Sequence, residues 1–171
     1  MILVFDASPI IAFYSETEMN EPSILHELPK FGYELVVPIA VVKEIQKGRK
    51  LTCSRLNESI NKGIIKLYDK FSVDEVSKLK VRHPKLGEGE IQVLILGRRL
   101  NTEGKEYFCI LDEGPATKIA LQYGIAKKGT IGLLNLINDL GIINKDKKEN
   151  LLNLLRHSSF RLKNSQVSEN R

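Results

Sequence analysis

The chain has 171 residues, of which 42% are apolar, and this length and composition suit one folded domain with a single core. The net charge of +5 favours an anionic partner such as nucleic acid, but dispersed lysines equally suit an ordinary solvated surface. Two cysteines exclude a disulfide framework, three widely spaced histidines lack zinc-ligand spacing, and no apolar run could span a bilayer. The apolar start meets Asp6 without a basic leader region, so we expect a strand, no signal peptide and a cytoplasmic protein.

Short apolar runs alternate with helical patterns along the whole chain. This alternation predicts a three-layer α/β/α domain over residues 1–163 with a mostly parallel central sheet, followed by a polar tail over 164–171. The predicted strands are 2–5, 34–37, 64–68, 107–111 and 125–127, with 64–68 a candidate edge strand. The first helix is expected to begin with Ser8 as N-cap and Pro9 as its first residue. Further helices are predicted at 22–28, 39–46, 52–61, 73–80, 87–99, 116–123, 130–140 and 147–156.

Acidic residues stand where such a fold places its chemistry, since ligands of open parallel sheets bind beyond the carboxyl ends of the strands. Asp6 ends the first strand, and Asp112, followed by Glu113, ends the 107–111 strand. Neither aspartate is required as a helix cap, because Ser8-Pro9 and Gly114-Pro115 can start the helices that follow. Both aspartates are therefore candidates for a functional site.

Three glutamates lie on two of the predicted helices, 39–46 and 87–99. Glu90 is three and four residues before Val93 and Leu94, so it borders the apolar face of its helix, and Glu44 borders the apolar face of the 39–46 helix. A carboxylate in such a place is costly unless a cation or hydrogen bonds compensate it. Glu88 has an equally good explanation in the positive end of its helix.

Together these carboxylates predict a site for a hard divalent cation. Several carboxylates in one crevice would repel one another, but a bound cation would keep them ionised. Ligation by oxygen alone selects Mg²⁺ or Mn²⁺, which would activate water and neutralise charge on a phosphodiester. The chain shows no Ser or Cys paired with His for covalent catalysis and no phosphate-binding glycine loop of the NTPase type.

These segments resemble the PIN-domain nucleases, and among them the VapC-like group. The resemblance runs through Val4-Phe5-Asp6-Ala7-Ser8-Pro9, Val37-Pro38-Ile39-Ala40-Val41-Val42-Lys43-Glu44, Leu86-Gly87-Glu88-Gly89-Glu90, Ile110-Leu111-Asp112-Glu113 and Lys128-Gly129-Thr130. It covers residues 1–162. Each segment alone is only weakly specific for this family, but the order and spacing of the five segments together are strongly specific.

The resemblance implies a metal-dependent endoribonuclease. Carried over, Asp6, Glu44, Glu90 and Asp112 would hold the metal, with Glu113 an alternative to Asp112. Thr130 would orient a water or an acidic side chain, although it could equally serve only as a helix N-cap. Many members have Asp where this chain has Glu90, and many are toxins of toxin–antitoxin pairs that dimerise, which implies an antitoxin partner and a homodimer here.

Two rival readings remain. The same fold could act as a binding or scaffold module without turnover, and metal-dependent stabilisation would separate the two. A phosphoryl-transfer protein also places Asp after a first strand, but the phosphatases of that kind need a second Asp where this chain has Ser8. Five basic residues could line a phosphate groove, although each also suits an ordinary surface: Arg98, Arg99, Lys118, Lys127 and Lys128.

Overall fold

A computed structural model describes residues 1–112 and 114–157. Glu113 and the predicted polar tail at 164–171 lie outside these residues. Within them, no helix is long and apolar enough to cross a membrane.

A five-stranded, all-parallel sheet forms the centre of the molecule, in the order β3-β2-β1-β4-β5. The central strands are continuous apolar runs because both faces of a parallel sheet are covered by helices. The predicted strands are confirmed, with 64–68 at the edge, and the last one shifts to a two-residue strand. Their bounds are β1 Ile2–Phe5, β2 Glu34–Pro38, β3 Ile65–Tyr68, β4 Tyr107–Ile110 and β5 Lys127–Lys128.

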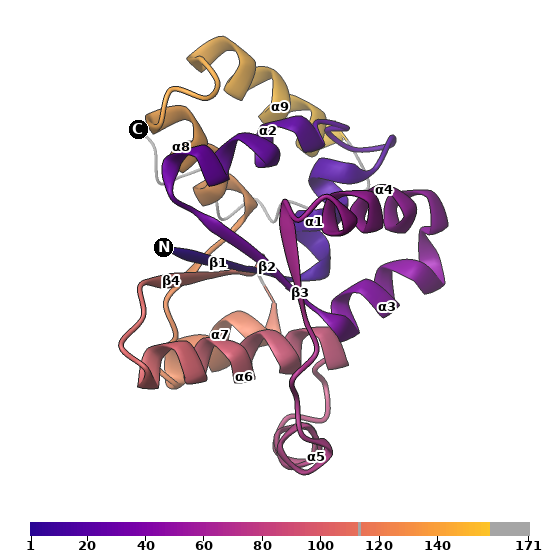
Figure 1. The fold of residues 1–171 in the computed structure, drawn as a ribbon, viewed down its shortest axis with the longest axis vertical. Coiled ribbons are helices and arrows are strands. Elements are labelled where there is room, and N and C mark those ends of the chain that lie inside the picture. The colour runs from indigo at the N-terminus through magenta and orange to yellow at the C-terminus, as the bar shows by residue number, and fades with distance from the viewer. Residues whose placement is uncertain (113, 158–171) are drawn as a thin grey trace.

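Helices cover the sheet on both sides and confirm the three-layer prediction (Figure 1). The helices α6 and α7 lie below the sheet in Figure 1, and α1, α2, α4, α8 and α9 lie above it. The first four helical segments are α1 Ala7–Tyr14, α2 Pro22–Glu27, the 3₁₀ helix η1 Leu28–Phe31 and α3 Ile39–Gly48. The remaining six are α4 Lys50–Asn61, α5 Val73–Arg82, α6 Glu88–Thr102, α7 Pro115–Gln122, α8 Thr130–Asp139 and α9 Lys145–His157.

The helix α6 packs closely against the sheet because Gly97 leaves no side chain between them. A Cβ at Gly97 would lie 2.7 Å from Cys109 Sγ and 2.9 Å from Ile125 Cγ2. Cys109 is a fully buried free thiol in β4.

The order of the strands reverses between β1 and β4. From β1 the chain proceeds outward through β2 and β3, and it then returns to the other side of β1 with β4 and β5. This is the topological switch point, where the loops after two neighbouring strands diverge and leave a crevice. Asp6 and Asp112 follow the two strands that flank it.

Candidate active site

Asp6 lies at the carboxyl end of the central strand and is almost completely buried. Its backbone N–H donates to Ile110 O over 3.2 Å, which continues the pairing of β1 with β4. The side chain is 9% exposed, and Asp6 Oδ1 has no hydrogen-bond partner. The expectation that Ser8 caps α1 is wrong: the helix begins at Ala7, and Asp6 itself stands at the N-cap, with its carboxylate making no capping bond to the first turn.

Asp112 is held by Thr130 across the switch point. Thr130 donates to both carboxylate oxygens, from its backbone N–H to Oδ1 and from its hydroxyl to Oδ2, each over 2.7 Å. Thr130 is fully buried as the first residue of α8. The cap of that helix is Gly129, so the expectation that Thr130 serves as the N-cap is wrong, and its hydroxyl bonds the carboxylate of Asp112 instead.

Glu90 and Glu44 meet at the start of α6. Glu90 Oε2 accepts from the backbone N–H of Gly87 over 2.8 Å. A Cβ built on Gly87 would be 3.7 Å from Glu90 Oε2 and 3.8 Å from Glu44 Oε2, so the two carboxylates flank the same point. Glu44 is exposed as a residue, yet its carboxylate lies against the first turn of α6.

The side chains of Glu44, Glu90 and Asp112 interact electrostatically with Asp6, and these four residues are called the acidic group. The pKa of Asp6 is raised to about 7, mainly by burial and to a lesser degree by Glu90, Glu44 and Asp112, against a lowering by the backbone N–H of Ala7. The pKa of Glu44 is also raised, first by desolvation and then by Glu90. The carboxylates therefore repel one another.

Two further residues fix the geometry of this site, and the sequence pattern did not reveal them. Gln92 is buried on α6, and its Oε1 accepts from the backbone N–H of Ala40 at the start of α3 over 3.0 Å. Gly89 allows the close approach of the two helices, since a Cβ there would lie 2.9 Å from Glu44 Oε2 and 3.1 Å from Val41 Cγ2. The only sequence signal was a glycine between two glutamates, Glu88 and Glu90.

Glu88 does not join this group. Glu88 is exposed, which fits its alternative as a favourable charge at a helix N-terminus. Glu113 lies outside the described residues.

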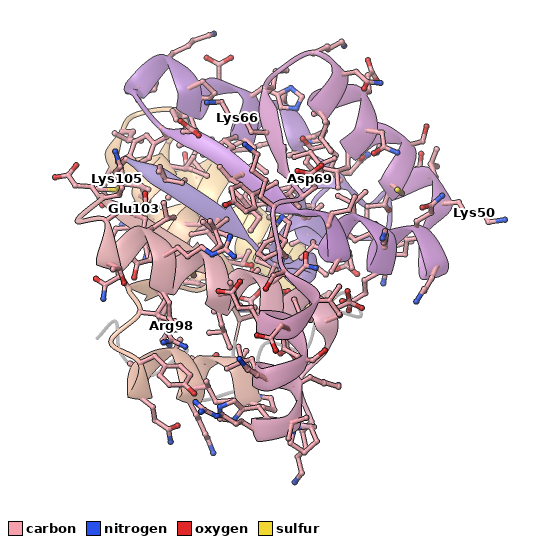
Figure 2. The ribbon with its side chains drawn as sticks, turned by 60° about the horizontal axis from the view of Figure 1, so that its bottom comes forward. Lys50, Lys66, Asp69, Arg98, Glu103 and Lys105 are labelled. Atoms are coloured by element: carbon pink, nitrogen blue, oxygen red, sulfur yellow. The ribbon has the colours of Figure 1, made fainter. Side chains whose placement is uncertain are left out.

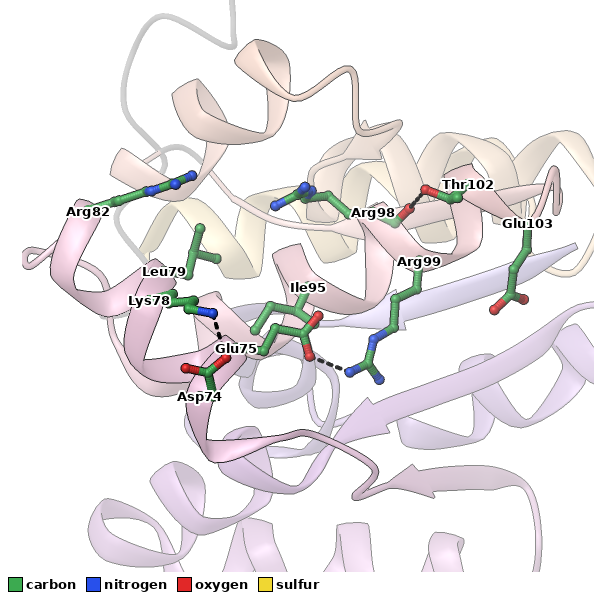
Figure 3. Close-up of a pocket in the computed structure, with 10 residues that line it drawn as sticks. All are labelled: Asp74, Glu75, Lys78, Leu79, Arg82, Ile95, Arg98, Arg99, Thr102 and Glu103. Atoms are coloured by element: carbon green, nitrogen blue, oxygen red, sulfur yellow. Dashed lines mark hydrogen bonds and ion pairs between the residues drawn. The ribbon is translucent and has the colours of Figure 1, made fainter.

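The predicted basic groove is not assembled from its five candidates. Arg99 forms an ion pair with Glu75 beneath a hollow of about 510 Å³ between α5 and α6 (Figure 3). Arg98 lies over the Tyr123 ring at 5.0 Å, and Lys128 lies over Phe108 at 4.5 Å. Lys118 is exposed and Lys127 is half-buried, on α7 and β5.

The donor set fits a hard divalent cation in its chemistry. All candidate ligands are carboxylate oxygens, and one of them, Asp6 Oδ1, is buried without a partner. No three or more His, Cys, Asp and Glu side chains within residues 1–112 and 114–157 are arranged to hold a metal. In the structure, Glu90 Oε2 accepts a hydrogen bond from Gly87, and both oxygens of Asp112 accept hydrogen bonds from Thr130.

Comparison with known families identifies the fold. A PIN domain family model matches residues 2–170, nearly the whole chain. The chain belongs to the PIN domain family. Members of this family are typically nucleases that use divalent metal ions. No curated protein matches the chain.

Proposed function

We propose that this PIN domain, over residues 1–163, is a Mg²⁺- or Mn²⁺-dependent endoribonuclease of the cytoplasm. The observation that carries the proposal is the buried Asp6 oxygen without a partner, at the switch point, with carboxylates from three other segments around it. An arrangement that costs stability in this way is typical of a functional site.

The residues divide the work between them. Asp6, Glu44, Glu90 and Asp112 would hold the metal, with Glu113 as the alternative to Asp112. When bound, the metal would supply a water of lowered pKa and neutralise charge on the phosphodiester. Thr130 fixes the orientation of Asp112 through two hydrogen bonds. Gln92 holds α3 and α6 together, which keeps Glu44 beside Glu90.

Cleavage of a mixed pool of single-stranded RNA tests the proposal. We expect cleavage with Mg²⁺ or Mn²⁺, none with EDTA, and a loss of at least about 10³-fold in Asp6→Asn and Asp112→Asn, as for removal of a metal ligand or key electrostatic group. Glu88→Gln is the control, because it removes a carboxylate from the first turn of α6, near Glu90 but outside the acidic group. Full activity in EDTA, or equal activity of Asp6→Asn and the wild type, would overturn the proposal.

A non-catalytic binding module is the second candidate. The observation that favours it is that no set of three carboxylates among the described residues is arranged to hold a metal. This candidate predicts no RNA cleavage and no stabilisation by Mn²⁺, whereas the nuclease predicts both.

The toxin half of a toxin–antitoxin pair is the biological setting that the VapC-like resemblance suggests. It carries two further expectations, an antitoxin protein and a homodimer. Expression of the wild-type chain should then arrest growth, and Asp6→Asn should not. Co-purification with the product of an adjacent small gene would identify the antitoxin.

A further inference from the structure

A row of three exposed lysines begins beside the acidic group. Lys43 and Lys47 stand four residues apart on α3, so they share one face with their Cβ atoms about 6 Å apart. Lys50 continues the row as the first residue of α4, and Figure 2 shows it extending away from the body of the molecule. Lys47 is close enough to Glu44 to lower the pKa of that carboxyl. The lysine row, Lys43, Lys47 and Lys50, therefore leads outward from the candidate active site.

These lysines differ from many other basic residues of the molecule because they form no ion pair within the described residues. None of the three forms an ion pair or a ring contact with any residue that the structure describes. By contrast, Lys78 pairs with Asp74, and Lys66 pairs with Glu34. A lysine without an internal partner can neutralise an external anion without first giving up an existing contact.

Two hollows flank the outer end of the row, and Lys50 lines both. The smaller, about 210 Å³, also contains Ser15, Glu16, Thr17 and Arg49. The Arg49 guanidinium donates to Ser15 Oγ over 3.0 Å and to Thr17 Oγ1 over 3.3 Å, with its side chain 35% exposed. Glu18 Oε1 lies 4.0 Å from the same guanidinium, which reduces its charge but fixes its position.

The larger hollow, about 740 Å³, runs beside α4 and offers amide side chains. Gln46, Asn57 and Asn61 line it together with Lys50 and Lys62. Lys62 is paired with Glu58, which leaves Lys50 as its unengaged cation. Hydroxyl and guanidinium groups suit phosphate, and amides suit the exposed edges of unpaired bases.

We propose that the lysine row is the track along which an RNA strand enters the acidic group, with successive phosphates on Lys43, Lys47 and Lys50 and a further phosphate at the Ser15–Thr17–Arg49 hollow. This inference rests on the proposed function, because it takes RNA as the substrate. An RNA strand fits better than an acidic protein, since the row starts at the proposed cleavage centre and ends between phosphate- and base-binding groups. With phosphates as the main contacts, binding depends strongly on salt and weakly on sequence.

Binding of a labelled single-stranded RNA to the full chain tests this track. The Asp6→Asn chain serves as background, so that the RNA stays intact. In it, the row variant Lys43→Gln/Lys47→Gln/Lys50→Gln is compared with a control variant, Lys30→Gln/Lys105→Gln/Lys145→Gln, which removes the same charge at exposed lysines elsewhere. Equal melting temperatures of the two variants establish that both fold.

We expect the row variant to weaken RNA binding at least tenfold, and to lower the slope of log affinity against log salt by about 2. The control should stay within about twofold of the background. Equal weakening of both variants, or none in either, would overturn the track. Displacement of RNA by polyglutamate at equal charge concentration would also overturn it, because the row would then be a general anion surface.

The outcome remains separate from that of the proposed function. RNA cleavage by the wild-type chain together with binding that ignores the row would retain the nuclease and reject the track. Binding that depends on the row, without cleavage under any metal, would reject the nuclease and retain the track as an RNA-binding surface.

Discussion

Two polar clusters in this PIN domain are built in opposite ways. In the neutral cluster, Tyr14, His26 and Ser59 meet from α1, α2 and α4. Tyr14 donates to Ser59 Oγ over 2.9 Å, and His26 Nε2 lies 3.1 Å from Tyr14 and 3.0 Å from Ser59. In the acidic group, Asp6 Oδ1 has no partner and faces three other carboxylates.

The difference indicates which cluster stabilises the fold and which one has a chemical role. A buried network with its polar groups bonded rigidifies a core, whereas an unbonded buried carboxylate costs free energy. The neutral cluster therefore holds the upper helices together, and the acidic group is a cost that a bound cation would relieve.

The largest effect is expected from the charge of Asp6. Its folded pKa is about 7 and its unfolded value about 3.8, so in this window the unfolded chain binds fewer protons than the folded one. The free energy of unfolding must therefore fall as pH rises from about 3.8 to 7, by up to about 4 kcal/mol. In metal-free urea denaturation, Asp6→Asn should become progressively more stable than the wild type across this window. A stability difference that does not change with pH would contradict the account.

Removing the Thr130 hydroxyl should have the next largest effect. Thr130→Ala leaves Asp112 Oδ2 without its side-chain donor, and a hydrogen bond to a charged group contributes about 1.5–3 kcal/mol. We expect that loss of stability by denaturation and a loss of activity of about tenfold, since Asp112 is no longer oriented. Thr130→Ser keeps the hydroxyl and should restore most of both. Equal activity of the alanine and serine variants would show that the hydroxyl does not position Asp112.

The neutral cluster should respond in stability only. Tyr14→Phe removes one hydroxyl from the network and should cost about 1–2 kcal/mol of unfolding free energy, with RNA cleavage unchanged. Tyr33→Phe, at a half-buried tyrosine on the rim of the core, is the control and should change stability by less than about 0.5 kcal/mol. A loss of cleavage in Tyr14→Phe would mean that the two clusters are coupled.

The pH dependence of the neutral cluster has the opposite sign. Burial lowers the pKa of His26 below 6.5, so below that value the unfolded chain binds the proton more readily than the folded one. The wild type should lose stability relative to His26→Gln as pH falls below 6.5, in contrast to the Asp6 effect. Urea denaturation of both proteins between pH 5 and 8 measures this, and a reversed slope would contradict it.

The smallest change in stability is expected at Gly89. In Gly89→Ala, the better helix former offsets close contacts with Glu44 Oε2 and Val41 Cγ2, so stability should stay within about 1 kcal/mol. Glu44 must move to make room, so RNA cleavage should fall by about tenfold. Gly48→Ala adds a Cβ with nothing within 4 Å at the end of α3 and should leave cleavage unaltered. Equal activity of the two variants would exclude a need for Glu44 at its present place.

The sequence predicted the features that depend on local pattern. Apolar runs that end in Asp6 and Asp112 identified two neighbouring strands of a parallel sheet, and the reversal of strand order brings those ends together. The start of α1 was predicted two residues too late, because Ser8-Pro9 is as good a helix start by pattern as Asp6-Ala7.

Features that depend on how helices cross could not be predicted in the same way. The contact from Ala40 to Gln92 and the space above Gly89 exist only because α3 and α6 cross at that point. The engagement of Arg98, Arg99 and Lys128 with aromatic or acidic partners likewise depends on tertiary packing, so a list of basic residues could not separate them from the lysine row.

Calorimetric titration of Mn²⁺ into the wild type and Asp6→Asn at pH 7.5 tests whether the acidic group is a metal centre. If it is, the wild type should bind Mn²⁺ and release protons from the carboxyl groups whose pKa is raised. Asp6→Asn should lose at least tenfold in affinity for Mn²⁺. Equal affinity of the two proteins, or no binding by the wild type, would contradict it and leave the group as a buried acidic cluster without a cation.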